Sequence, residues 1–198
     1  MIRILLIRHG TTDPLGRVLY GRMPGVHLNA EGRSQAQMVG QTLKQRYGLN
    51  EVISSPMERT LETAQFVAAP QGLNITTEAG LNEIDFGSWM GNSFEQLRDR
   101  EDWRRYNESR STTWPPGGES MPEVQARAYR ALESVVQRHR ENATVAAVSH
   151  GDVVRGLLLL LLGMPIDHIH RLEIAPASVS EIWMGAGQPR VINVNQLF

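Results

Sequence analysis

Two histidines, His9 and His150, occupy the same kind of position: each follows a short apolar run and is followed by a glycine. The runs, at residues 2–7 and 144–149, are aliphatic or β-branched and are bounded by breakers, which is typical of buried strands. Ligands of open α/β sheets bind outside the carboxyl ends of strands, and glycine lets the chain turn sharply there. The pattern therefore predicts that both imidazoles face one crevice; two unrelated loop histidines are the alternative.

Two arginines could bring anion-binding groups to the same crevice. Arg8 directly precedes His9, and Arg59 follows Ser55-Pro56-Met57-Glu58, which has the spacing of a helix capping box. Capping alone accounts for that tetrapeptide, so we assign it no chemistry. A guanidinium in a first helical turn opposes the macrodipole. It either points into solvent, the commoner case, or helps the helix N-terminus to hold an anion, and with Arg8 it would then form a phosphate pocket without a metal.

Phosphate chemistry also needs a proton donor, and the run 81–85 offers two carboxylates, Glu83 and Asp85. The pattern alone does not choose between them, because either carboxylate could instead cap a turn. The identity of the acid therefore stays open at this point.

Strand and helix patterns alternate along the chain, which argues for an α/β layered fold with a largely parallel sheet. Apolar residues recur at helical spacing over residues 30–47, 57–69 and 121–140. Two strand candidates near the C-terminus are joined by a Gly/Pro turn, and a hairpin there would add an antiparallel strand. The expected strands are 2–7, 51–54, 144–149, 179–184 and 191–194.

The composition excludes several classes of function. The chain has 198 residues, 41% hydrophobic and 21% charged, and a formal net charge of −1, so nothing attracts nucleic acid or an anionic membrane. Cysteine is absent, which rules out disulfides, thiolate metal sites and thiol nucleophiles. The six leucines of 157–162 are too few to span a bilayer, and we expect a helix buried on all sides. A cytoplasmic enzyme is the default expectation, and a homodimer remains an option.

Residues 86–114 differ in character from the rest, because they hold six of the twelve aromatic residues among dense charge. One interpretation is a solvated helix pinned by a few aromatic side chains; the other is a cap over a substrate pocket, spanning about residues 86–120. Pro115-Pro116-Gly117-Gly118 closes the stretch. Ser120 and Glu123 have the spacing of a second capping box, and Glu119 beside them could face a substrate.

Four motifs stand in an order typical of one protein family. They are Arg8-His9-Gly10, Ser54-Ser55-Pro56-Met57-Glu58-Arg59-Thr60 with Thr63-Ala64, Leu81-x-Glu83-x-x-Phe86-Gly87-x-Trp89-x-Gly91, and Ser149-His150-Gly151. On these motifs the chain resembles the histidine phosphatase superfamily, with its phosphoglycerate mutase-like fold, from residue 2 to about 184. Pro116-Gly117-Gly118-Glu119-Ser120 resembles the phosphatase branch. The resemblance implies a single domain over residues 1–198, built as a three-layer α/β/α sandwich with a mostly parallel sheet and one antiparallel strand.

The resemblance also implies roles for the residues of the site. His9 matches the nucleophile that becomes phosphohistidine, and Glu83 matches the general acid, which would decide between the two carboxylates. Arg8, Arg59 and His150 match the groups that bind the phosphoryl oxygens. His9 must then be neutral, with its other ring N–H on a backbone carbonyl, and a protonated His150 would add to the field of the arginines. No cofactor and no metal is implied; His168 and His170 have no further ligands in the sequence.

One position departs from the family pattern. Many members have an asparagine six residues after the nucleophile, and this chain has Leu15 there. Thr11, Thr12 or Arg22 could fill part of that polar role. We expect substrate-binding contacts from Gly10, Thr12, Arg22 and Gly151.

Three functions compete on this basis. The favoured one is a metal-independent phosphomonoesterase that acts on a small phosphorylated metabolite through phosphohistidine. The alternative is a 2,3-bisphosphoglycerate-dependent phosphoglycerate mutase, which returns the phosphoryl group to bound product; such mutases are typically longer and differ after the acid, where this chain has Phe86-Gly87-x-Trp89. A phospho-ligand binding domain without catalysis is disfavoured, because such relatives usually lose the nucleophile or an arginine. The expected partner is a small phosphate ester.

Overall fold

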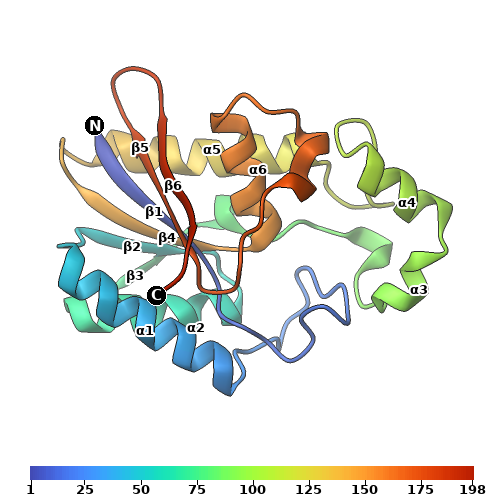
Figure 1. Cartoon of the computed structure of the whole chain (residues 1–198), viewed down its shortest axis with the longest axis horizontal. Coiled ribbons are helices and arrows are strands. Elements are labelled where there is room, and N and C mark those ends of the chain that lie inside the picture. Colours follow the sequence, from blue (N-terminus) through green and yellow to red (C-terminus); the bar gives the residue numbers. More distant parts are fainter.

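The computed structural model describes residues 1–198 and contains one six-stranded sheet with helices on both faces (Figure 1). The strands are β1 (Ile2–Arg8), β2 (Glu51–Ser54), β3 (Ile75–Thr77), β4 (Thr144–Ser149), β5 (Val179–Met184) and β6 (Arg190–Gln196). Their order in the sheet is β3-β2-β4-β1-β5-β6. β5 is antiparallel to both of its neighbours, whereas the pairs among β1 to β4 are parallel. The expected antiparallel strand is therefore β5.

The alternation of side chains along β1 builds a core on each face of the sheet. The helices are α1 (Ala30–Arg46), α2 (Glu58–Ala68), α3 (Phe94–Arg98), α4 (Glu101–Glu108), α5 (Met121–Arg138) and α6 (Gly151–Leu161). Ile4 and Leu6 pack with apolar residues of α5 and α6, while Leu5 and Ile7 pack with those of α1 and α2. Successive residues of a strand point to opposite faces, so one buried strand serves both layers.

The expected fold class is confirmed, since the sheet lies between two helical layers and contains one reversed strand. All five expected strands and all three expected helices are present, with ends that shift by at most a few residues. The pattern missed β3, and it gave no bounds for α3 and α4, although one interpretation placed a helix within residues 86–114. It also missed four short 3-10 helices, at Ala69–Gln71, Ala79–Leu81, Gly87–Trp89 and Ile166–Arg171.

The expectation of a helix buried on all sides at the leucine run is wrong. Leu157, Leu158 and Leu159 are buried in the core, but Leu160 is 43% exposed and Leu162 is 45% exposed. α6 therefore covers one face of the sheet and presents its other side outward. No helix of the protein combines the length and the apolar character that crossing a membrane requires.

Residues 86–120 carry α3 and α4, which lie at one end of the molecule, away from α1 and α2 (Figure 1). A small aromatic core holds the segment together: Trp89 meets the rings of Trp103 and Tyr106 edge to face, at centroid distances of 5.4 Å and 5.3 Å. Trp89 and Tyr106 are almost fully buried. The segment is tied to α6 by Arg110, whose guanidinium lies 2.8 Å from the carboxylate of Asp152.

Candidate active site

The parallel pairing of β1 and β4 brings the two histidines together. Arg8 is paired with Ser149 in the sheet, so His9 and His150 leave their strands side by side. Their rings lie edge to face with centroids 5.4 Å apart. The register of two neighbouring strands therefore places the two imidazoles next to each other at the carboxyl ends of these strands; His9 lines the cavity there.

His9 is held in one tautomer. Its Nδ1 lies 2.8 Å from the carbonyl oxygen of Gly10, which can only accept, so Nδ1–H donates and Nε2 keeps its lone pair. The side chain is buried, and burial together with the charges of Arg59 and Arg8 lowers the pKa of His9 well below its usual value. A neutral imidazole with a free Nε2 is the form that a nucleophile requires.

Arg8 and Arg59 lie near the histidines, and each has guanidinium N–H groups that are not hydrogen-bonded. Arg8 Nη1 donates to the carbonyl of Ile174 over 2.6 Å, and Arg59 Nη2 donates to the carbonyl of Gly21 over 2.7 Å. Arg8 Nε, Arg59 Nε and Arg59 Nη1 are buried without a partner. Buried donors are almost always satisfied, so three unpaired ones on two cations indicate a place for an anion.

The N-terminus of α6 adds to this anion-binding region. The helix begins at Gly151, directly after His150. A side chain at Gly151 would place its Cβ 3.1 Å from Arg8 Nε, which is tighter than ordinary packing allows. Glycine at this position therefore keeps the Arg8 guanidinium against the helix terminus, whose free N–H groups favour negative charge.

The structure separates the two candidate carboxylates. Glu83 is buried and lines the cavity beside His9, and its burial raises the pKa of the carboxyl to about 7. Asp85 accepts from the Gly87 N–H over 2.9 Å and its side chain is 40% exposed. A carboxyl with a pKa near neutrality can hold a proton and release it, so the geometry favours Glu83 as the acid.

Both ring nitrogens of His150 have hydrogen-bond partners that suit the neutral imidazole. Arg59 Nη2 donates to Nδ1 of His150 over 3.1 Å, so this nitrogen accepts and Nε2–H points to Ser55 Oγ, 2.8 Å away. Burial and the charge of Arg59 lower the pKa of His150 well below its usual value. His150 is therefore neutral in this structure, with Glu83 Oε2 at 3.6 Å from its Nδ1.

The expected capping box at Ser55 is also wrong. α2 begins at Glu58 with Met57 as its N-cap and no capping side chain, and Glu58 instead accepts from the Gly25 N–H. Ser55 orients His150. By contrast, the second capping box, at Ser120, is present as expected.

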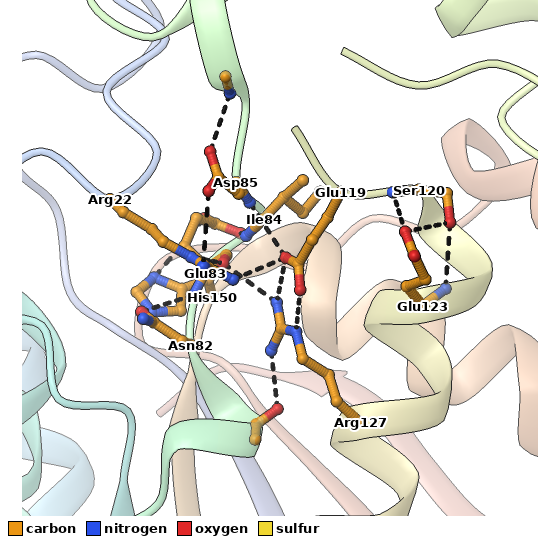
Figure 2. A network of polar contacts seen from close by, with 12 residues as sticks. Arg22, Asn82, Glu83, Ile84, Asp85, Glu119, Ser120, Glu123, Arg127 and His150 are labelled. Atoms are coloured by element: carbon orange, nitrogen blue, oxygen red, sulfur yellow. Dashed lines mark hydrogen bonds and ion pairs between the residues drawn. The ribbon is translucent and has the colours of Figure 1, made fainter. Parts of the chain in front are cut away.

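The remaining expected contacts fall in different places. Gly10 lies against the backbone of α1, where a Cβ would come within 2.5 Å of the Gly32 carbonyl oxygen. Thr12 is buried and its hydroxyl donates to Tyr20 Oη over 3.3 Å. Arg22 points to Glu83 from behind and donates to the Glu83 carbonyl over 2.7 Å (Figure 2). Gly10, Thr12 and Arg22 thus contact the groups that surround the cavity.

A cavity of about 130 Å³ opens in front of His9 and Arg8. Leu15, at the position where the family often has asparagine, lies in its wall together with Gly151 and Glu83. The wall also contains a charged pair, Asp152 with Arg155, whose groups lie 2.9 Å apart. Its apolar lining comes from Leu15, Val18, Leu19, Phe86 and Phe94.

Several residues of the site gave no usable signal in the sequence. Asn82 accepts from the Glu83 N–H over 2.9 Å, and the Tyr20 ring lies 4.8 Å below the Arg59 guanidinium. Only the fold brings these residues to the site, because their neighbours in sequence have no common pattern. The structure contains no group of three or more histidine, aspartate or glutamate side chains placed to hold a metal ion.

Comparison with known proteins gives the family. The model of the histidine phosphatase superfamily (branch 1) matches residues 4–197. The structure of YhfR from Bacillus stearothermophilus superimposes with a TM-score of 0.92 at 28% identity, over 100% of this chain and 98% of that one.

Two curated relatives add to this picture. Phosphoserine phosphatase 1 of Hydrogenobacter thermophilus is 32% identical over 199 residues, which cover 98% of this chain and 92% of the relative. The bifunctional protein Rv2228c of Mycobacterium tuberculosis is 35% identical over 196 residues, or 96% of this chain and 53% of the relative. The chain therefore spans about half the length of the second relative.

Proposed function

The chain belongs to the histidine phosphatase superfamily, branch 1, and we propose that it is a metal-independent phosphomonoesterase that acts on a small phosphorylated metabolite. One observation carries this proposal. Three buried guanidinium nitrogens of Arg8 and Arg59 have no partner, and they flank a neutral histidine whose Nε2 is free. A phosphoryl group would satisfy these donors and present its phosphorus to His9.

The proposed reaction has two halves. In the first, His9 Nε2 attacks phosphorus in line, the bond to the ester oxygen breaks, and Glu83 gives its proton to the departing alcohol. Phosphohistidine results, with Nδ1–H still on the Gly10 carbonyl. In the second, the Glu83 carboxylate takes a proton from water, the water oxygen attacks phosphorus, and the P–N bond breaks. Phosphate leaves, His9 returns to its neutral form and Glu83 is again protonated.

In this proposal, positively charged side chains rather than a metal ion stabilise the negative charge of the transferring phosphoryl group. Arg8, Arg59 and the N-terminus of α6 would stabilise the equatorial oxygens of the transferring group, where most of the charge lies. A bound phosphoryl dianion also raises the pKa of His150, so we propose that His150 becomes protonated when substrate binds rather than before. Gly10, Thr12, Arg22 and Gly151 would complete the site, Gly10 and Gly151 by making room.

We also propose that residues 1–198 work as one domain in which the segment 86–120 caps the substrate side of the cavity. Phe86 and Phe94 of this segment line the cavity, which supports the assignment. The cavity volume of about 130 Å³ suits a small leaving group. Because one relative is named a phosphoserine phosphatase, O-phosphoserine belongs in the first substrate panel.

The decisive experiment measures phosphate release from p-nitrophenyl phosphate and from a panel of phosphorylated metabolites. We expect turnover by the wild type, none by His9→Ala, and an acid-labile, base-stable phosphate on His9 during turnover. Conversion of 3-phosphoglycerate to 2-phosphoglycerate without free phosphate would instead establish the mutase alternative. Binding of phosphate without any turnover would establish a binding domain.

A further inference from the structure

Glu119 lies near the general acid and bonds two arginines at once (Figure 2). It is not one of the residues that line the cavity. Its carboxylate accepts from Arg22 Nη2 over 2.6 Å and from Arg127 Nε over 2.8 Å. Arg127 Nη2 and the Asp85 N–H, each at 3.1 Å, complete its partners. Both carboxylate oxygens are thus engaged, so Glu119 does not face a substrate.

Both arginines converge on one atom of the acid. Arg22 Nε donates to the carbonyl oxygen of Glu83 over 2.7 Å, and Arg127 Nη2 donates to the same oxygen over 3.1 Å. Arg127 also donates to the Gly80 carbonyl over 2.8 Å. Two cations and one anion therefore fix the main chain on both sides of Glu83.

The backbone of Glu119 continues the same contact. Its N–H donates to the Asp85 carbonyl over 2.9 Å, while its carboxylate accepts from the Asp85 N–H. The glycine before it is required, because a Cβ at Gly118 would come within 2.3 Å of the Asp85 carbonyl oxygen. Glu119, Arg22 and Arg127 thus hold the main chain of residues 83–85, although they lie far apart in the sequence. We call these three residues the clamp.

The clamp touches the main chain of Glu83 and leaves its carboxyl group to the cavity. Glu83 Oε1 accepts from the Ile84 N–H over 3.0 Å, and Oε2 lies near His150. No arginine of the clamp is bonded to that carboxyl. A side chain with so few contacts depends on its backbone for position, and a displacement of about 1 Å can slow a reaction ~10²-fold.

We propose that Glu119 is a positioning residue, which acts through Arg22 and Arg127 to hold Glu83 at the distance that proton transfer requires. The inference rests on the proposed function, since it assigns Glu83 the role of acid. It also gives Arg22 a different task from direct substrate binding. Glu119 joins the loop after β1, the acid and α5 into one unit.

The test compares two substrates that differ in how much they need an acid. p-Nitrophenolate leaves without a proton, whereas phenolate, from the otherwise matched phenyl phosphate, benefits from one. Glu119→Gln keeps the size of the side chain but not its charge. We expect kcat/KM for phenyl phosphate to fall at least ~10-fold and that for p-nitrophenyl phosphate to change less than ~3-fold.

Glu123→Gln is the matched control. Glu123 lies in the first turn of α5, four residues after Glu119, and caps that helix together with Ser120, but it has no contact with Arg22 or Arg127 (Figure 2). We expect this variant to change both substrates equally and little. Arg22→Lys is the second variant, in case Glu119→Gln folds poorly, because lysine cannot bond Glu119 and the Glu83 carbonyl with one planar group.

The outcomes separate the alternatives. A selective loss with phenyl phosphate in Glu119→Gln or Arg22→Lys, absent from Glu123→Gln, supports the positioning role. An equal loss with both substrates, or a weaker inhibition by inorganic phosphate in Arg22→Lys, overturns it in favour of a structural or substrate-binding role. No phosphate release by the wild type overturns the proposed function and this inference with it, whereas an active wild type with an unchanged substrate ratio in the variants overturns the inference alone.

Discussion

Two regions of the molecule treat charge in opposite ways. The strand-end site, which comprises Arg8, His9, Arg59, Glu83 and His150, buries its charged groups and leaves guanidinium nitrogens unpaired. The cap segment, residues 86–120, packs aromatic rings together and keeps most of its charges at the surface; the exception is Arg110, which is buried, pairs with Asp152 and also has an Nε without a partner. Arg104, for example, is more than half exposed and pairs with Glu101 and Glu108 along α4.

The difference separates what each region contributes. Buried, unpaired donors cost stability, and in the strand-end site a phosphoryl group would satisfy them, so we propose that they serve binding and catalysis there. Rings packed on rings, and one buried ion pair to α6, serve stability. Substitutions in the strand-end site should therefore reduce activity without unfolding the protein, and substitutions that weaken the ion pair between the cap segment and α6 should lower stability more than activity.

The largest effect is expected from Arg59→Met. Loss of an arginine that stabilises a transferring phosphoryl group costs ~10³-fold or more, so kcat/KM for p-nitrophenyl phosphate should fall by at least that factor. The unfolding temperature should not fall. The substitution removes a buried charge with two unpaired nitrogens, which is favourable for stability. This gain offsets the loss of the hydrogen bonds from Arg59 to Gly21 and His150. Activity assays and thermal unfolding measure the two quantities.

Inorganic phosphate provides the control for that substitution. A ligand that binds only the folded state raises the unfolding temperature. Phosphate should therefore stabilise the wild type and have no effect on Arg59→Met. A variant that keeps more than about a tenth of the activity would show that Arg59 does not bear on the transferring group.

The next effect concerns Glu83→Gln and depends on the leaving group. p-Nitrophenolate departs without a proton, so phosphorylation of His9 should survive, but the water that opens phosphohistidine lacks its base. We expect a burst of p-nitrophenolate near one per active site, then slow turnover. Alkyl phosphates should show no burst and a loss of at least ~10²-fold. Rapid mixing and chemical trapping of phosphohistidine measure both steps.

Asp85→Asn is the matched control for Glu83→Gln. Asp85 is two residues away and accepts from the Gly87 N–H, so its substitution should leave both substrates within a few-fold of wild type. If Glu83→Gln kept wild-type rates, or if Asp85→Asn showed the burst, Asp85 would be the proton donor and the assignment of Glu83 would be wrong.

A smaller effect is expected from pH. Burial raises the pKa of Glu83 to about 7, so the protonated acid prevails below that pH and is lost above it. kcat/KM for alkyl phosphates should therefore fall above pH 7, by up to about tenfold per pH unit, while that for p-nitrophenyl phosphate stays flatter. The low pKa of His9 keeps the nucleophile neutral across this range. A pH-independent rate with alkyl phosphates would contradict a titrating Glu83.

The sequence predicts the strand-end site better than the cap segment, and the reason is local. β1 and β4 are mostly apolar runs, and a glycine follows each of them closely. The local sequence pattern is therefore enough to identify both strands and the positions where they end. α4 has a dense charge pattern. It is held in place by the contact between Tyr106 and Trp89, which are distant in the sequence. β3 has three residues and depends on pairing with β2.

Local rules also fail where tertiary contacts compete with them. Ser55 has the spacing of an N-cap, but its hydroxyl is hydrogen-bonded to His150, which follows another strand, β4. Glu119 stands beside a true capping box, yet its partners, Arg22 and Arg127, come from separate parts of the chain. Motif spacing finds the residues that we propose to contact the phosphoryl group, and only the fold finds those that hold them in place.

The smallest effect on activity is expected from Arg110→Met, in the cap segment. Arg110 is almost fully buried and lies 2.8 Å from Asp152, which keeps a second partner, Arg155, at 2.9 Å. Its loss should lower the free energy of unfolding by about 1–3 kcal/mol, because the carboxylate of Asp152 is then left with Arg155 alone. kcat/KM for p-nitrophenyl phosphate should change less than ~3-fold. Urea unfolding measures the first quantity, and the exposed Arg104→Met, which should leave the midpoint unchanged, is its control. A large loss of activity at unchanged stability would place Arg110 with the strand-end site and remove the distinction between the two regions.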